Sequence, residues 1–119
     1  TYLSQLTSAW QNAIKQVNKL SSAGSQSTTI KTTADKLFLL SEVEIFGSTS
    51  YSVSGEGTQY AYYKAGNSKV KNVSGSANSW WERSPFASAA AYFCYVTSDG
   101  IAYYHNASGS FGVAFGFCV

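Results

Sequence analysis

Few side chains in this sequence could do chemistry, and none has a spacing typical of an active site. Cys94 and Cys118 lie in apolar runs, where a thiol behaves as a small hydrophobic group; whether they form a disulfide stays open. The single histidine, His105, has Ser and Asp nearby in sequence but no triad spacing. There is no Cys-x-x-Cys pair or Cys/His cluster. We therefore predict no catalytic residue, no metal site, no cofactor and no enzymatic activity.

Two glutamates and one arginine are the other candidates for chemistry. Glu42 and Glu44 could be read as paired catalytic carboxylates. However, the run Ser41-Glu42-Val43-Glu44 has the form of a capping box, and acidic residues favour the first turn of a helix. We interpret both glutamates as capping residues. Arg83 is the only arginine, and we expect its fork of donors to brace loops rather than to polarise a substrate.

The composition indicates one domain with a weakly charged surface. Of 119 residues, 45% are hydrophobic and 12% are charged, against about 25% charged in ordinary soluble domains. This suits an extracellular or virion surface better than the cytosol. The net charge of +2 comes with scattered lysines, so nucleic-acid binding is not expected. No apolar run approaches the roughly 18 residues of a membrane span. Because the chain starts at Thr1, we expect a domain cut from a longer protein.

Periodicity places the elements of the first 80 residues. Apolar residues three and four apart predict one amphipathic helix over residues 3–20, either packed on the core or contacting an oligomer partner. With its linker it forms a predicted N-terminal part, 1–33, packed on a main domain, 34–119. Further along, we expect a strand or loop over 25–33, a buried strand over 36–40, a helix from Ser41 ended by Gly47, a surface loop over 48–57, a helix or strand over 58–64 and a polar loop over 67–78.

The C-terminal third carries large aromatic residues, which are expected either to be buried in the core or to contact a binding partner. Adjacent residues of a strand face opposite sides, so one of Trp80 and Trp81 should fill the core and the other should cover a second layer. Pro85 should end that strand. The apolar run Gly112–Val119 is expected to be a second fixed strand that clamps the core.

Between these blocks the sequence predicts a hairpin. Residues 92–97 and 101–105 are rich in β-formers and flank Ser98-Asp99-Gly100, a three-residue loop with Gly in the left-handed position. That loop places Tyr95, Thr97, Ile101 and Tyr103 on one face and Cys94, Val96 and Ala102 on the other, smaller face. The smaller face should pack on the core. The Tyr-bearing face should face solvent, and exposed aromatic rows indicate a partner.

One compositional break coincides with this hairpin. Lys, Glu, Gln, Met and Trp make up about a fifth of an ordinary chain. Residues 1–85 contain 19 of them, whereas Phe86–Val119 contains none. The second segment is therefore under a different constraint from the first.

The motifs Trp-Trp-Glu-Arg-Ser-Pro at 80–85, Phe93-Cys94, Ser98-x-Gly100 and the terminal Gly112–Val119 run resemble the variable proteins of diversity-generating retroelements, in particular a phage and bacterial family with a Trp-Trp-x-Arg-Ser-Pro signature. Residues 37–47 are also similar to the strand–helix element of formylglycine-generating-enzyme-like C-type lectin folds. The resemblance covers residues 34–119. It implies an α+β domain with a C-type-lectin-like fold and a small antiparallel sheet bearing a variable hairpin.

The resemblance also implies how the five residue types came to be absent. In such systems template adenines are randomised, chiefly in Asn codons, and changes in the first two bases of those codons never give Lys, Glu, Gln, Met or Trp. The implied variable, ligand-binding positions are Phe86, Ser88, Ala90, Ala91, Tyr92, Tyr95, Thr97, Asp99, Ile101, Tyr103, Tyr104, His105, Asn106, Gly109 and Phe111.

The implied function is a hypervariable binding domain that recognises a protein or glycan receptor on a bacterial surface. It would act in adhesion or host recognition at a phage tail tip, in the virion, or on a bacterial cell surface. Neither nucleic-acid binding nor membrane insertion is expected, and a homo-oligomer through the parent protein is compatible with the sequence. The alternative is a structural oligomerisation cap, which predicts that a sister chain buries the Tyr face.

Overall fold

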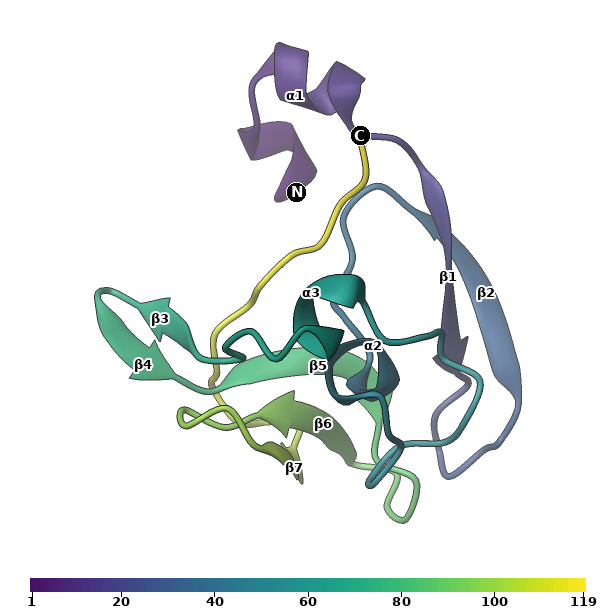
Figure 1. Ribbon diagram of the computed structural model, residues 1–119. Helices are drawn as coiled ribbons and strands as arrows, with labels where there is room; N and C mark the ends of the chain where they lie inside the picture. Colours follow the sequence, from purple (N-terminus) through teal and green to yellow (C-terminus); the bar gives the residue numbers. More distant parts are fainter.

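The computed structural model describes residues 1–119 as short helices and three small antiparallel sheets packed into one body (Figure 1). The α+β class is therefore confirmed. The helical elements are a 3₁₀ turn at Leu3–Gln5, α1 (Ser8–Ala13), α2 (Glu42–Phe46) and α3 (Ala61–Lys64). The strands are β1 (Val17–Ser22), β2 (Ile30–Asp35), β3 (Lys71–Val73), β4 (Ser76–Asn78), β5 (Trp80–Pro85), β6 (Tyr92–Val96) and β7 (Ala102–Asn106).

Each sheet is built from neighbouring strands of the sequence. β1 pairs with β2, β3 pairs with β4, and β5, β6 and β7 form the three-stranded sheet in that order. The β6–β7 end and the end that holds α1 and both termini lie on opposite sides of the molecule (Figure 1). No helix is long and apolar enough to cross a membrane.

Two elements form as local sequence signals predict. Ser41 caps α2, and its side chain and that of Glu44 complete the capping box reciprocally. Gly47 ends the helix in the left-handed conformation. In the β6–β7 hairpin, Gly100 has φ +86° and the Thr97 amide donates to the Ile101 carbonyl. The three-residue loop thus sets the predicted register, in which Tyr95 lies opposite Tyr103.

The predicted helix over residues 3–20 is wrong beyond its first half. α1 ends at Ala13, Ile14 is already extended, and the chain enters β1 at Val17. The apolar residues keep a helical spacing, but β1 gains a full antiparallel ladder with β2. That ladder points Lys19 inward to a buried ion pair with Glu44. Remote pairing therefore overrides local propensity. The predicted boundary between residues 33 and 34 falls inside β2.

Two predicted strands are only isolated bridges. In the run 36–40, Phe38 alone is buried, and it pairs with Gly116. A Cβ at Gly116 would lie 2.6 Å from the Phe38 ring, so the two backbones meet only because this residue is glycine. The run 112–119 is extended and bridges Trp80, Phe38 and Lys15, but its odd-numbered side chains are exposed and do not fill the core.

The structure also shows the conformation of three segments, 25–33, 58–64 and 67–78, and the state of the two cysteines. The 58–64 segment forms α3 as a helix, and the 25–33 segment enters β2 at Ile30. The polar 67–78 run, predicted as a loop, contains the β3–β4 hairpin, whose turn at Ser74-Gly75 has positive φ at both residues. Both cysteines are free; Cys94 is buried and Cys118 is exposed.

The core lies between the three-stranded sheet and the helices. Trp80 is buried with Val96, Ile45 and Tyr63, while Trp81 remains partly exposed on the other side of the sheet. The prediction that the two tryptophans serve different layers is confirmed, as is the end of β5 at Pro85. The inner side of the sheet is fixed by packing, so the outer side is free for another role.

Candidate ligand-binding face

The sheet is anchored by a nearly buried ionic node at Glu44. One carboxylate oxygen lies 2.5 Å from Lys19 Nζ and the other 2.6 Å from Arg83 Nη1. Burial alone would raise the pKa of the Glu44 carboxyl, but hydrogen bonds from Arg83, Lys19 and the Ser41 amide outweigh it and hold that pKa below its usual range. Glu44 thus stays ionised and holds both cations.

Arg83 extends this node to the backbone of several segments. Its guanidinium donates to the carbonyl oxygens of Leu20, Leu39 and Glu56 at 2.8–3.1 Å, in addition to Glu44. It therefore ties β5 to β1, to the run before α2 and to the loop after it. The prediction that Arg83 braces loops is confirmed, and its donors are used within the fold.

The outer side of the β5–β6–β7 sheet carries a row of rings. Trp81, Tyr95 and Tyr103 lie side by side on consecutive strands, with ring centroids 6.1 and 6.2 Å apart. The four side chains predicted to face solvent differ in exposure. Ile101 is 59% exposed and Tyr103 is 46% exposed, whereas Tyr95 and Thr97 are half-buried. Of the four side chains predicted to face solvent, two do so fully and two in part.

Phe111 explains the partial burial of Tyr95. After β7 the chain folds back, and the Phe111 ring lies 4.5 Å from Tyr95, 4.7 Å from Trp81 and 5.2 Å from His105. These five residues, Trp81, Tyr95, Tyr103, His105 and Phe111, are called the aromatic face below. Edge-to-face and tilted contacts of this kind stabilise aromatic pairs beyond their buried area, so the face holds its shape without a ligand.

A second group of rings borders the aromatic face at the edge of the sheet. Tyr104 stacks on Phe86 at 3.9 Å and on Tyr103 at 4.8 Å. Tyr92 and Tyr51 also contact Tyr104, at 6.1 and 5.3 Å. Tyr92 and Tyr104 belong to the side of the sheet that carries Cys94 and Val96, so they are less free to change than Tyr103.

The remaining implied variable positions are small or polar. Ser88, Ala90 and Ala91 are exposed in the loop between β5 and β6, and Asp99 is exposed in the hairpin turn. Asn106 instead holds the next turn, because its Oδ1 accepts from the Ser108 amide.

Gly109 is sterically restricted. A Cβ there would lie 2.7 Å from His105 Nδ1. A larger residue at Gly109 would displace the His105 ring, so these two positions are coupled.

Sequence reasoning missed residues that border this surface. Tyr51, in the Ser-rich loop before α3, contacts Phe86, Tyr103 and Tyr104, and its carbonyl accepts from the Ala87 amide. No local signal marks this tyrosine. Trp81 was assigned to a second layer but not to the binding surface, although its place opposite Tyr95 follows from the strand pairing.

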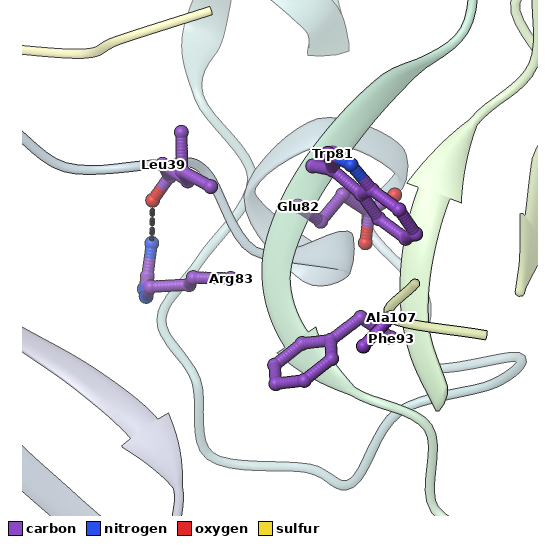
Figure 2. Close-up of a pocket in the computed structure, with 6 residues that line it drawn as sticks. All are labelled: Leu39, Trp81, Glu82, Arg83, Phe93 and Ala107. Carbon is purple, nitrogen blue, oxygen red and sulfur yellow. Dashed lines mark hydrogen bonds between the residues drawn. The ribbon is translucent and has the colours of Figure 1, made fainter. Parts of the chain in front are cut away.

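A hollow of about 380 Å³ lies beside the aromatic face (Figure 2). It is lined by Leu39, Trp81, Glu82, Arg83, Phe93 and Ala107. Figure 2 shows the Trp81 and Phe93 rings on one side and Leu39 with Arg83 on the other, joined by a hydrogen bond of 2.8 Å. Because Arg83 is engaged within the fold, the hollow offers an apolar surface rather than an anion site.

Behind the sheet lies a buried carboxyl without a partner. Neither oxygen of Glu82 makes a hydrogen bond, and the residue is 2% exposed. Burial raises the pKa of Glu82 well above its usual range, and the nearby Glu42 and Glu56 carboxylates raise it further. Glu42 accepts from the Tyr51 and Ser52 amides, so it fixes the loop that positions Tyr51.

The thiols and the lone histidine form no catalytic arrangement. Burial raises the pKa of Cys94, and the Glu82, Glu42 and Glu56 carboxylates add to the effect. Its thiol therefore stays protonated and unreactive. His105 Nδ1 lies 3.1 Å from the Asn106 carbonyl. No group of three or more His, Cys, Asp or Glu side chains is arranged to hold a metal ion.

Comparison with known proteins places the sequence in one family. The family described as a domain of unknown function, DUF6273, matches residues 1–119. The chain belongs to this family. No curated protein and no solved structure matches it. The DUF6273 match takes in the N-terminal turn, α1 and the β1–β2 hairpin together with the sheet.

Proposed function

We propose that this DUF6273 domain is a ligand- or receptor-binding module whose contact surface is the aromatic face with the adjoining loops 86–91 and 97–101. The single observation that carries the proposal is an uncharged, partly exposed array of aromatic rings on a sheet whose opposite side is fixed by the core. Rings of this kind supply large contact area at low entropic cost. The hollow beside Trp81 offers a place for one apolar group of the ligand.

The proposal includes the finer fold and the origin of the surface. A C-type-lectin-like fold and diversification by a retroelement account for the absence of five residue types after Pro85. The working site would be a phage tail tip or a bacterial cell surface, with a protein or glycan receptor as the partner. Alternation along β6 supports this division, because Cys94 and Val96 are buried while Tyr95 and Thr97 point outward.

A pair of displayed libraries tests the binding role. The first randomises five exposed positions with Asn-derived codons: Ser88, Ala90, Asp99, Ile101 and Tyr103. The control library randomises buried positions of the same sheet: Trp80, Ser84, Cys94 and Val96. We expect the first library to keep the display level of the parent and to yield binders to a soluble test protein such as streptavidin. The control library should lose display.

Two outcomes would count against this role. If the first library also loses display, the five side chains are structural and the face is not free to vary. If it displays well but yields no binder against several unrelated test proteins, the surface is not a general recognition surface.

A further inference from the structure

The end of the molecule that holds α1 and both termini lies opposite β6 and β7 (Figure 1). Exposed aromatic side chains give this end a second apolar surface. It is a seam between the N-terminal residues and the C-terminal run 112–119. The Tyr2 ring packs on Phe115 at 4.8 Å, and the Trp10 ring packs on Phe117 at 5.7 Å. These contacts leave much of each ring uncovered. The exposed fractions are 61% for Tyr2, 49% for Trp10, 38% for Phe115 and 46% for Phe117.

The C-terminal run also has a free backbone edge. Gly112, Gly116 and Cys118 form backbone hydrogen bonds with Ser79, Trp81, Phe38 and Lys15. The amides and carbonyls of the odd residues, Val113, Phe115 and Phe117, have no partner in the chain. Alternate residues of an extended strand point their polar groups to opposite edges. One edge of the run is therefore paired and the other is open.

The seam is hollowed as well as apolar. Hollows of about 340, 340 and 230 Å³ lie along it. The hollows share lining residues, because Leu6, Leu37 and Phe117 each line two of them. An open edge with apolar side chains above it is a template for strand addition. A monomer that left it open would carry an aggregation risk.

We propose that the open edge pairs with the same edge of a second copy of this chain, antiparallel about a two-fold axis. The run 113–119 contains no charged residue, so two-fold pairing places apolar side chains opposite apolar side chains and creates no like-charge contact. Together, the exposed parts of these four aromatic side chains equal the surface of nearly two whole side chains. That is about 400 Å² of exposed area per copy. With Val113 and Val119, complete covering of these side chains in both copies would bury about 1,000 Å², the lower bound for a specific interface.

The dimer pairing does not use the residues of the aromatic face. α1 and the C-terminus lie opposite β6 and β7 (Figure 1), whereas the run 112–119 begins beside Trp81, whose amide donates to the Gly112 carbonyl. Pairing centred on Phe115 involves neither Phe111 nor Trp81, so we expect both aromatic faces to stay open to a ligand. An interface near the lower size bound is expected to be weak, with a dissociation constant in the micromolar range. The inference does not depend on the proposed ligand-binding role.

Sedimentation equilibrium of the full 119-residue chain, over a concentration series from low to high micromolar, tests the proposal. We expect a reversible dimer. Val113→Lys places a charge against the apolar Phe117 of the second copy, and Phe115→Pro removes an amide that has no partner within the chain. Each should weaken dimerisation at least tenfold. Val113→Lys should leave the melting temperature of the monomer unchanged, whereas Phe115→Pro also removes the ring that packs on Tyr2 and should lower it. The control Ile101→Lys, in the β6–β7 turn and outside the pairing run 113–119, should leave dimerisation unchanged.

Cys118 supplies a distance that depends on the register. It is the exposed thiol, whereas Cys94 is buried and protonated, so a thiol-reactive spin label goes to Cys118 alone. Pairing centred on Phe115 separates the two Cys118 positions by about 20 Å along the strands. A double electron–electron resonance measurement should show one narrow distance near that value, extended by the label arms.

Three results would overturn the proposal. A chain that stays monomeric at every concentration would show that the open edge does not pair with a second copy. A dimer unaffected by both Val113→Lys and Phe115→Pro would place the interface elsewhere. A dimer abolished by Ile101→Lys would place the self-association surface at the β6–β7 turn, which adjoins the aromatic face.

Discussion

Glu82 makes the stability of this domain depend on pH in an unusual direction. Its carboxyl is buried, unpartnered and close to Glu42 and Glu56, and its folded-state pKa is raised. In the unfolded chain a glutamate has a pKa of about 4.3. Folding at a pH between the unfolded and the folded pKa therefore takes up a proton at Glu82. The stabilisation is fully present below the unfolded pKa and is lost as the pH rises through the folded pKa.

The size of the effect follows from proton linkage. One proton taken up on folding lowers the free energy of unfolding by about 1.4 kcal/mol for each pH unit above the unfolded pKa, until the folded pKa is reached. Between pH 5 and pH 7 the loss is up to about 2.7 kcal/mol, a large part of the roughly 5–15 kcal/mol of a typical domain. Glu44 acts in the opposite sense, because its lowered pKa makes its stabilisation fall away in acid. Stability should therefore be greatest in mild acid.

Urea unfolding followed by tryptophan fluorescence, to which the buried Trp80 contributes with Trp10 and Trp81, measures this. We expect the wild-type midpoint to fall from pH 5 to pH 7. Glu82→Gln keeps the side-chain shape and removes the ionisable group. This variant should show a flat profile over that range and should be more stable than the wild type at pH 7.

A contrasting variant separates Glu82 from the ionic node. Glu44→Gln breaks the pairs with Lys19 and Arg83 and should destabilise the domain at both pH values. The reasoning is refuted if the wild-type midpoint is equal at pH 5 and pH 7, or if Glu82→Gln is less stable than the wild type at pH 7.

Other predictions concern the frame, the face and the gene. Arg83→Lys keeps the charge but leaves buried carbonyls unsatisfied, and should cost about 3–5 kcal/mol in urea unfolding; a loss under about 1 kcal/mol would contradict the bracing role. Gly116→Ala places a methyl group against the Phe38 ring and should cost about 1–3 kcal/mol by the same assay; an unchanged midpoint would show that the bridge can widen. Ile101→Ala should change the midpoint by less than about 1 kcal/mol, because the side chain is exposed, and Tyr95→Ala should cost more because Phe111 covers it. Sequencing around the gene should find a reverse transcriptase gene and a near-identical repeat of the segment for residues 86–111 whose mismatches fall at adenines; without such a repeat, the retroelement origin fails.

Local signals in the sequence were sufficient for the parts of the fold that close over a few residues. The capping box at Ser41 and the left-handed Gly100 each act within about five residues, and both formed as predicted. The split between Trp80 and Trp81 followed from the two-residue period of a strand. These elements set the register of the hairpin and hence the row of rings on its outer side.

Parts that depend on remote partners could not be read in the same way. Val17 and Leu20 continue the helical spacing of α1, yet the ladder with β2 draws them into a strand. The inward turn of Lys19 depends on Glu44, 25 residues away. Tyr51 joins the edge of the aromatic surface only because Glu42 holds its loop. The sequence shows each residue but not the partner that decides its role.

The ionic node also determines how much of the chain must be present before the domain can fold. Its hydrogen bonds span 25 residues from Lys19 to Glu44, 39 from Glu44 to Arg83 and 63 from Leu20 to Arg83. Closing loops of that length costs chain entropy before any contact offsets it, and such topologies fold slowly. The first 82 residues cannot assemble the node without Arg83, so the frame should form in one late, cooperative step rather than by stages. The side chains of the aromatic face make none of the node's hydrogen bonds, so we expect changes at the exposed Tyr103 to leave the rate of folding unchanged.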